Sequence, residues 1–96
     1  MEAKEFVKQY GWDEARKCIP YCSKRGDFIY YKNIGINFNN LKTLVYAWEL
    51  VEKFGGLFHA KVTLEKEGFT GGIELDDELI EDVVLKQAIK LVEQCQ

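Results

Sequence analysis

The sequence has little of several features that would assign it to a functional class. Its 96 residues include one histidine and one proline, and no apolar run approaches the roughly 20 residues of a membrane-spanning helix. Thirteen Lys and Arg against sixteen Asp and Glu give a net charge of −3, which argues against binding to nucleic acid through overall positive charge. The first residues, Met-Glu-Ala-Lys-Glu, do not resemble a signal peptide. We therefore expect one soluble domain over residues 1–96, located in the cytoplasm.

Motifs for catalysis and for metal binding are also missing. The cysteines Cys18, Cys22 and Cys95 are odd in number, and without an export signal we expect free thiols. Cys18, Cys22 and His59 would supply three zinc ligands, but a structural zinc site needs four, and Pro20 is expected to break a helix between the two thiols. We predict a protein that is not an enzyme and that holds no metal and no cofactor.

What the sequence does contain is helical periodicity. Apolar residues recur at the i, i+3, i+4 and i+7 spacing of amphipathic helices, and Asn39 and Asn40 are suitable N-cap residues for the clearest of them. The pattern predicts a mainly α fold, a small helical domain of four to five helices with glycine-jointed helix pairs. The expected helices cover residues 3–10, about 13–19, 41–54, 57–66 and about 76–94.

Residues 28–38 do not follow the helical pattern. The run Phe28–Tyr31 is aromatic and β-prone, Lys32-Asn33 and Gly35 are typical of turns, and Ile36 alternates with polar neighbours. One short β-hairpin near residues 28–38 is one interpretation, and an irregular aromatic loop is the other.

A short pattern occurs twice in the chain. Residues 5–16 resemble residues 49–61: each copy reads acid, two apolar residues, two polar residues, an aromatic and glycine, followed further on by alanine and a base. The pattern predicts a helix, a glycine turn and a second helix whose alanine allows close approach. We favour a packing device over a helix that reads DNA, because the second helices offer few basic residues without acidic ones beside them.

The two halves of the chain differ in charge. Residues 1–48 contain eight Lys and Arg and five Asp and Glu, a balance of +3, whereas residues 49–96 contain five and eleven, a balance of −6. Six of the acids crowd together and form what we call the acidic segment: Glu74, Asp76, Asp77, Glu78, Glu81 and Asp82. The segment is either a solvated helix start or a surface that docks a basic partner.

Basic residues gather in the first half among aromatic ones. The basic cluster consists of Arg16, Lys17, Lys24, Arg25 and Lys32. It is interleaved with Tyr21, Phe28, Tyr30 and Tyr31. Bases among aromatics suit a single-stranded nucleic acid. They equally suit a small core with a charged rim, because small domains need aromatic side chains to fill their interior.

Several stretches of turn and core residues together suggest a lineage. They are Ala3–Val7, Tyr10-Gly11, Leu41–Val45, Glu49–Glu52, Gly55–Leu57 and Ala60-Lys61. This pattern resembles that of small phage and prophage accessory proteins over about residues 3–19 and 39–66, but not in the tail from Gly68. The resemblance implies the cytoplasm of a bacterial host, and a protein that acts by binding and blocking host machinery such as defence complexes.

Two hypotheses of function follow. The first is a non-enzymatic, phage-type accessory protein that binds and inhibits a host protein or complex, such as nucleic-acid-handling or defence machinery, through the acidic segment. The alternative is a small nucleic-acid-binding regulator that uses the basic cluster. Acid–base catalysis by Asp76-Asp77 and Glu81-Asp82 is disfavoured, because no histidine or metal set lies nearby in the sequence. A homodimer through the apolar face of Leu79–Cys95 stays open.

Overall fold

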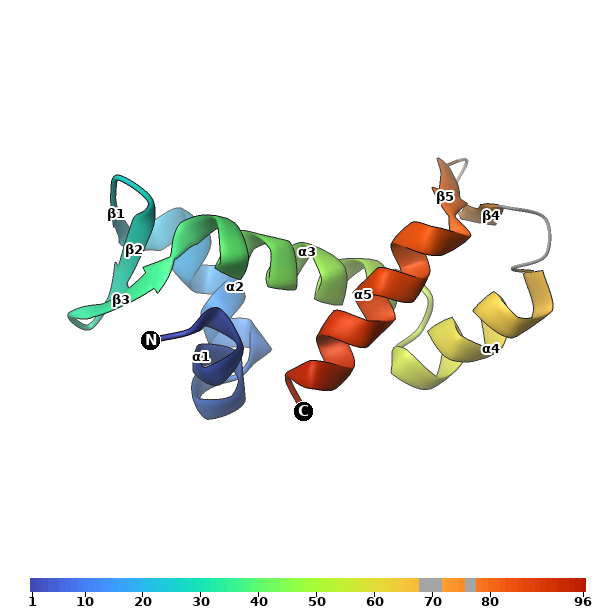
Figure 1. The fold of residues 1–96 in the computed structure, drawn as a ribbon, viewed down its shortest axis with the longest axis horizontal. Helices are drawn as coiled ribbons and strands as arrows, with labels where there is room; N and C mark the ends of the chain where they lie inside the picture. The colour runs from blue at the N-terminus through green and yellow to red at the C-terminus, as the bar shows by residue number, and fades with distance from the viewer. Residues whose placement is uncertain (68–71, 76–77) are drawn as a thin grey trace. The chain divides into compact units, whose positions relative to one another are not determined.

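The chain folds into helices joined by short antiparallel strands (Figure 1). The computed structural model describes residues 1–67, 72–75 and 78–96. Within them lie five helices and two sheets, which confirms the predicted mainly helical fold. The elements are α1 (Ala3–Tyr10), α2 (Trp12–Tyr21), β1 (Ser23–Arg25), β2 (Phe28–Tyr31), β3 (Ile34–Asn37), α3 (Phe38–Lys53), α4 (Leu57–Glu67), β4 (Gly72–Leu75), β5 (Glu78–Glu81) and α5 (Asp82–Gln94).

The chain divides into two compact units. Unit 1 comprises residues 1–46 and 94–96, and unit 2 comprises residues 47–93. The division falls within α3, so this helix contributes residues to both units. The expectation of one domain stays a prediction, and each unit is described by itself below.

Unit 1 begins with the first copy of the predicted helix–glycine–helix pattern. Helix α1 ends at Gly11, which has φ of +91° and donates from its N–H to the Val7 carbonyl at 2.8 Å. Glycine suits this position because a side chain disfavours positive φ. Helix α2 follows and contacts α1, and Ala15 on α2 is completely buried. The close approach expected from this alanine is therefore present.

The prediction that Pro20 would end the second helix is wrong. Helix α2 continues to Tyr21 with Pro20 inside it. A proline in the last turn forgoes only one backbone donor, and the N–H of Cys22 closes the turn on the Cys18 carbonyl at 2.8 Å. The proline therefore leaves the last helical turn, from Cys18 to Cys22, intact.

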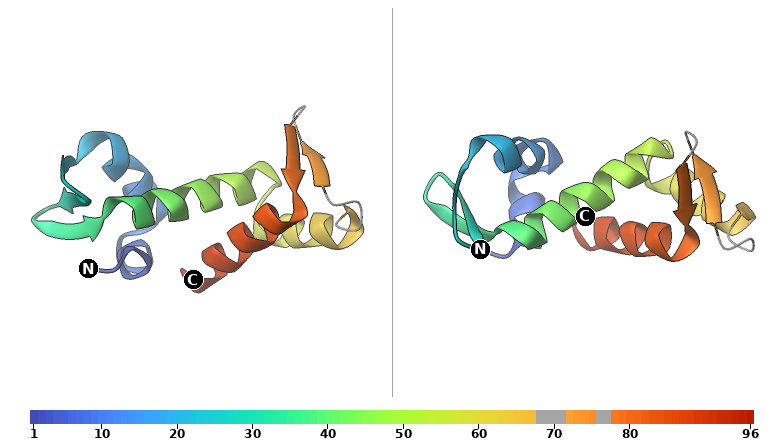
Figure 2. Two further views of the ribbon diagram at one scale, coloured as in Figure 1. Left: turned by 45° about the horizontal axis from the view of Figure 1, so that its top comes forward. Right: turned by 90° about the horizontal axis from the view of Figure 1, so that it is seen from above.

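The hairpin interpretation of residues 28–38 is correct, and the irregular loop is not formed. Strands β2 and β3 pair antiparallel and β1 adds to the other edge of β2 (Figure 2). The β2–β3 turn has two central residues with positive φ, Lys32 at +47° and Asn33 at +71°, which is the type I′ geometry of tight hairpins. Sequence reasoning missed β1, because Ser-Lys-Arg has neither apolar alternation nor β-branched residues.

Helix α3 starts earlier than expected. It begins at Phe38, and the side-chain oxygen of Asn37 accepts from the N–H of Asn40 at 2.9 Å. Asn37 is therefore the N-cap, and the expectation that Asn39 or Asn40 would cap the helix is wrong. The cap is placed by the sheet, since Asn37 is the last residue of β3.

The second helix–glycine–helix copy joins α3 to α4 in unit 2. The N–H groups of Gly55 and Gly56 donate to the carbonyls of Glu52 at 3.0 Å and Val51 at 3.2 Å, the bonding of a Schellman cap. Ala60 on α4 is completely buried, as its counterpart Ala15 is on α2. Leu57 and Leu64, which lie at helical spacing from Ala60 on α4, are only half-buried.

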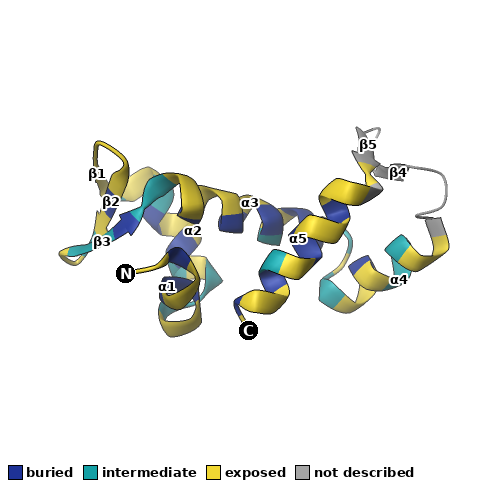
Figure 3. Cartoon of the chain, viewed as in Figure 1, coloured by how far each residue is buried: buried dark blue, intermediate teal, exposed yellow. Residues whose placement is uncertain are grey.

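The last helix is shorter than predicted. Residues 72–75 and 78–81 form the paired strands β4 and β5, and α5 starts only at Asp82. Ile73, Glu74 and Leu75 alternate as strand residues do, but Leu79 and Ile80 are adjacent apolar residues and give β5 no such signal. Figure 3 shows the buried stripe along α5, which includes Leu85, Ile89 and Val92. Over the described ranges, no helix combines the length and the apolar character that crossing a membrane requires.

Candidate nucleic-acid interface

The charge difference between the two halves follows the structural division. Unit 1 contains eight Lys and Arg and five Asp and Glu, a balance of 8 − 5 = +3. Unit 2 contains five and eleven, a balance of 5 − 11 = −6. The two balances sum to the net charge of −3. Each unit therefore has its own electrostatic character, and unit 1 is the basic one.

The register of the sheet gives unit 1 one face that points away from its core. Ser23 pairs with Tyr30, and Arg25 pairs with Phe28, so these four residues lie on the same side of the sheet. We call this side the outward face; on β3 it continues through Gly35 and Asn37. Phe28 is 46% exposed and Tyr30 is 39% exposed. The outward face thus presents two aromatic side chains to solvent beside an exposed arginine.

The opposite face of the sheet is anchored in the core of unit 1. Ile29 and Ile36 pair across β2 and β3, and both are completely buried. The Tyr31 ring packs on the same side, 5.1 Å from the ring centroids of both Phe6 and Tyr10. Because alternate residues of a strand point to opposite faces, this anchoring directs Tyr30 outward.

A hydrogen bond ties the sheet to α2. The Tyr31 hydroxyl donates to a carboxylate oxygen of Glu14 at 3.1 Å. Loss of contact with water and the neighbouring Glu14 carboxylate both raise the pKa of Tyr31 above its ordinary value. The hydroxyl therefore stays protonated, and remains a donor, throughout the neutral range.

Two lysines flank the start of α3. The Lys24 amino group lies 4.3 Å from the centre of the Phe38 ring, and that of Lys42 lies 5.9 Å from it. Both distances allow a cation–π interaction. The N–H of Phe38 donates to the Asp27 carbonyl at 2.8 Å, which ties the start of α3 to the β1–β2 turn. Lys24 of the basic cluster and Lys42, which lies outside that cluster, therefore both lie near the Phe38 ring.

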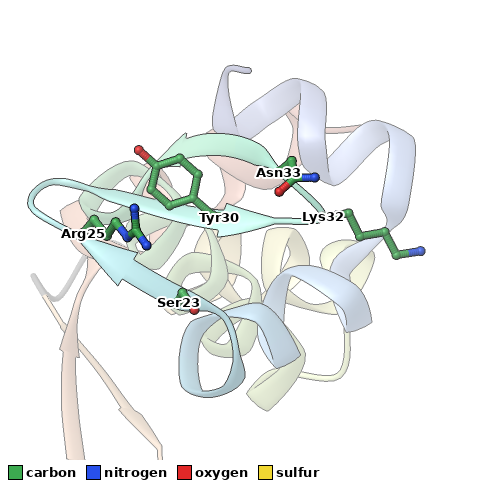
Figure 4. Close-up of a pocket in the computed structure, with 5 residues that line it drawn as sticks. All are labelled: Ser23, Arg25, Tyr30, Lys32 and Asn33. Carbon is green, nitrogen blue, oxygen red and sulfur yellow. The ribbon is translucent and has the colours of Figure 1, made fainter.

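A pocket of about 500 Å³ opens beside the outward face (Figure 4). Its lining residues are Ser23, Arg25, Tyr30, Lys32 and Asn33. They come from β1, from β2 and from the turn between β2 and β3. The volume lies within the range of about 300–1,000 Å³ that is usual for small-molecule sites. Figure 4 shows Arg25 beside the Tyr30 ring, whereas the Lys32 side chain extends away from both of them.

The structure divides the predicted basic cluster. Arg25 and Lys32 line the pocket, whereas Lys24 contacts the Phe38 ring instead. Arg16 and Lys17 are exposed on α2 and belong neither to the pocket lining nor to the outward face. Sequence reasoning missed Ser23 and Asn33 as site residues. A signal for Asn33 was available in the sequence. The β-prone run Phe28–Tyr31 is followed by Lys32-Asn33, and a tight I′ turn is common after such a strand.

The acidic segment belongs to unit 2, and part of it lies outside the described residues. Glu74 is on β4, Glu78 and Glu81 are on β5, and Asp82 begins α5. Glu81 is exposed. Asp76 and Asp77 lie outside the described residues. Of the two interpretations of this segment, the helix start is wrong for Glu74, Glu78 and Glu81, which lie on strands, and docking of a basic partner stays a prediction.

The three zinc ligands considered from the sequence belong to different units, Cys18 and Cys22 to unit 1 and His59 to unit 2. Cys18 and Cys95 are buried and Cys22 is half-buried, all three as free thiols. Burial raises the pKa of Cys18 to about 12, and interactions with Cys22 and Glu14 act in the same direction. His59 is exposed on α4 with its ring 5.7 Å from that of Phe58. Over residues 1–67, 72–75 and 78–96, no three metal-binding side chains gather at one point.

The chain was compared with protein-family models, with curated proteins and with solved structures, and none of them matches it. The candidate interface therefore rests on its own geometry, namely the register that turns Phe28 and Tyr30 outward and the pocket that Arg25 and Lys32 line.

Proposed function

We propose that unit 1 binds single-stranded nucleic acid on the outward face of its sheet, and that the protein acts as a non-enzymatic binding protein. The observation that carries the proposal is the pair of exposed rings, Phe28 and Tyr30, on one face of β2 with Arg25 beside them. Every base has a flat face, so exposed aromatic rings bind successive bases with little dependence on sequence. A neighbouring arginine adds attraction to the phosphates.

The packing of unit 1 supports a surface role for these two rings. Small domains use aromatic residues to fill their core, but here Ile29, Ile36 and Tyr31 occupy that side of the sheet. Phe28 and Tyr30 project to the other side, where they leave apolar surface in water. A bound base would cover that surface.

The charge of unit 1 sets the expected strength of binding. An excess of three positive charges is modest, so affinity depends on stacking as well as on phosphate contacts. If about three cations contact phosphates, the logarithm of the association constant should fall with the logarithm of salt concentration with a slope of about −2. A slope near zero would not fit a nucleic-acid interface.

Fluorescence anisotropy with a labelled single-stranded octanucleotide tests the proposal. Phe28→Ala and Tyr30→Ala should each weaken binding by about 1–3 kcal/mol, the usual contribution of one stacked base. Tyr46→Ala is the matched control, because Tyr46 is 65% exposed and belongs to α3 instead of the sheet. Absence of binding at low salt, or equal losses in all three variants, would overturn the proposal.

A second candidate function is favoured by the charge of unit 2. Eleven acids against five bases within residues 47–93 raise the self-repulsion of this unit, and a basic partner would relieve it. The candidate is docking of a host protein or complex through the acidic segment, in agreement with the resemblance to phage accessory proteins. It places the partner on unit 2 and leaves the outward face of unit 1 free for nucleic acid.

Charge reversal separates this second candidate from the first. The triple variant Asp76→Lys, Asp77→Lys and Glu78→Lys should abolish co-purification of a host partner while oligonucleotide binding is kept. Glu65→Lys is the control, since Glu65 is an exposed acid on α4 of the same unit. Unchanged capture of the partner by the triple variant would show that the acidic segment is not the docking surface.

A further inference from the structure

The two aromatic rings of the outward face are each partly covered and partly open to water. Phe28 is 46% exposed and Tyr30 is 39% exposed. Part of the Tyr30 ring lies against the neighbouring strand, because its Cε1, Cδ1 and Cζ atoms would lie 3.3, 3.8 and 3.9 Å from a Cβ atom placed on Gly35. Each ring therefore offers its open side to a single base.

The spacing of the two rings along the strand differs from the spacing of stacked bases. Phe28 and Tyr30 are two residues apart on β2, and a strand rises by about 3.3 Å per residue, so their Cα atoms are about 6.6 Å apart. Successive bases of a stacked strand are about 3.4 Å apart. Neighbouring bases can therefore each cover one ring only if the strand opens and extends between them.

The charge of the outward face lies close to both rings. Of the residues that the strand register places on this face, only Arg25 is charged. It pairs with Phe28 across β1 and β2, and Figure 4 shows its side chain beside the Tyr30 ring. A guanidinium group binds a phosphate through two parallel N–H donors. Arg25 is thus placed for the phosphate that joins a base on one ring to a base on the other.

We propose that the outward face binds two adjacent nucleotides of an unstacked, pyrimidine-rich single strand, with one base on Phe28, the next on Tyr30 and the phosphate between them on Arg25; the inference rests on the proposed function. Pyrimidines are favoured because they stack weakly on one another, so a pyrimidine strand opens at little cost. An adenine strand gives up more of its own stacking before it reaches both rings.

A different arrangement would insert a single base between the two rings. A gap of about twice the stacking distance has room for one base. Such a sandwich needs the two rings to stand face to face along β2, whereas the Tyr30 ring leans across Gly35 on β3. The two arrangements differ in what they require of the strand, because only the first needs two bases that are adjacent.

Two octamers of equal composition test this requirement on the unmodified protein. Each has four uracils and four abasic nucleotides, arranged as adjacent pairs of uracils in one octamer and in strict alternation in the other. We expect the paired octamer to bind several-fold more tightly in fluorescence anisotropy at low salt, because the alternating octamer must loop out an abasic nucleotide to place a base on each ring. In Phe28→Ala, which retains one ring, the two octamers should bind equally. Equal affinities for the unmodified protein, or a difference that persists in Phe28→Ala, would overturn the inference.

The base preference and the role of Arg25 are tested with labelled octauridylate and octaadenylate. Octauridylate should bind several-fold more tightly, and this preference should shrink in Phe28→Ala. Arg25→Gln should keep the melting temperature, because Arg25 is exposed on an edge strand. It should make the salt dependence of octauridylate binding shallower by about 0.7 in the logarithmic slope, the value for one lost phosphate contact on a single strand. Lys66→Gln, at an exposed lysine on α4, is the control and should leave the slope unchanged.

Failure of the inference can be told apart from failure of the proposed function. If octauridylate binds but octaadenylate binds as tightly, or if Arg25→Gln leaves the slope unchanged, the two-nucleotide arrangement is wrong and the proposed function stands. If the unmodified protein binds no oligonucleotide at low salt, the proposed function itself fails, and the inference fails with it.

Discussion

Gly35 lies directly opposite Tyr30 in the sheet, and the Tyr30 ring leans across it. A Cβ atom placed on Gly35 would lie 3.3 Å from Cε1 of Tyr30, which is tighter than ordinary van der Waals contact. The glycine therefore allows the ring to rest on the neighbouring strand. This arrangement holds the exposed ring in one place on the outward face.

Gly35→Ala should separate binding from stability. The added methyl group would press on the Tyr30 ring and push it off the neighbouring strand towards solvent. We expect a change in the free energy of unfolding of less than about 1 kcal/mol, since Gly35 has no positive φ and alanine restricts the unfolded chain. Octanucleotide affinity should fall several-fold in the same sample. Undiminished affinity would show that the position of this ring is irrelevant.

Tyr31→Phe should destabilise the protein, because it removes the donor to Glu14 and leaves that half-buried carboxylate without this partner. The midpoint of thermal unfolding is expected to fall by a few degrees. Tyr46→Phe, which removes a hydroxyl from an exposed tyrosine, is the control and should have no effect. Equal midpoints for the two variants would mean that the bond to Glu14 contributes nothing.

Alkaline pH should weaken the fold through Cys18. Its pKa is raised from 9.0 to about 12, and that of Cys95 is also raised, chiefly by burial. Above pH 9 the unfolded chain loses thiol protons that the native state retains, so stability falls as pH rises towards 12. Urea unfolding at a series of pH values should show this decline, with a smaller slope in Cys18→Ala. Identical slopes would contradict the assignment.

Asn37 should contribute to stability as the cap of α3. Asn37→Ala removes the acceptor for the Asn40 N–H and is expected to cost about 1 kcal/mol. Asn39→Ala is the control, because the Asn39 side chain is exposed within the first turn and caps nothing. Urea denaturation of both variants measures the difference. A larger loss of stability in Asn39→Ala would show that Asn39, and not Asn37, is the N-cap.

Local patterns were sufficient to predict much of the fold. The first helix, Ala3–Tyr10, was predicted with its observed bounds, and the fourth to within one residue, because both combine apolar periodicity with a glycine that requires positive φ. The turn-forming pair Lys32-Asn33 made the hairpin one of two interpretations of residues 28–38, the other being an irregular loop. These features depend on neighbours within a few residues along the chain.

The errors arose where the pairing of strands decides the structure. Strand β1 exists because β2 offers it an edge, and its own residues Ser23–Arg25 carry no strand signal. The start of α3 was misplaced because the sheet positions Asn37 as the cap. Strand β5 was assigned to the last helix because its apolar residues also fit a helical face, and its partner β4 was not predicted. The pocket could not be predicted either, because Arg25 and Asn33 line it together only once the strands are paired.

The most direct test of the central claim is the salt dependence of octanucleotide binding by the unmodified protein and by Tyr30→Ala. The account predicts binding that weakens with salt with a slope of about −2, and a loss of about 1–3 kcal/mol in the variant with its melting temperature retained. Binding that is absent at low salt, or that is equal in the two proteins, would contradict the claim that the outward face is a nucleic-acid interface.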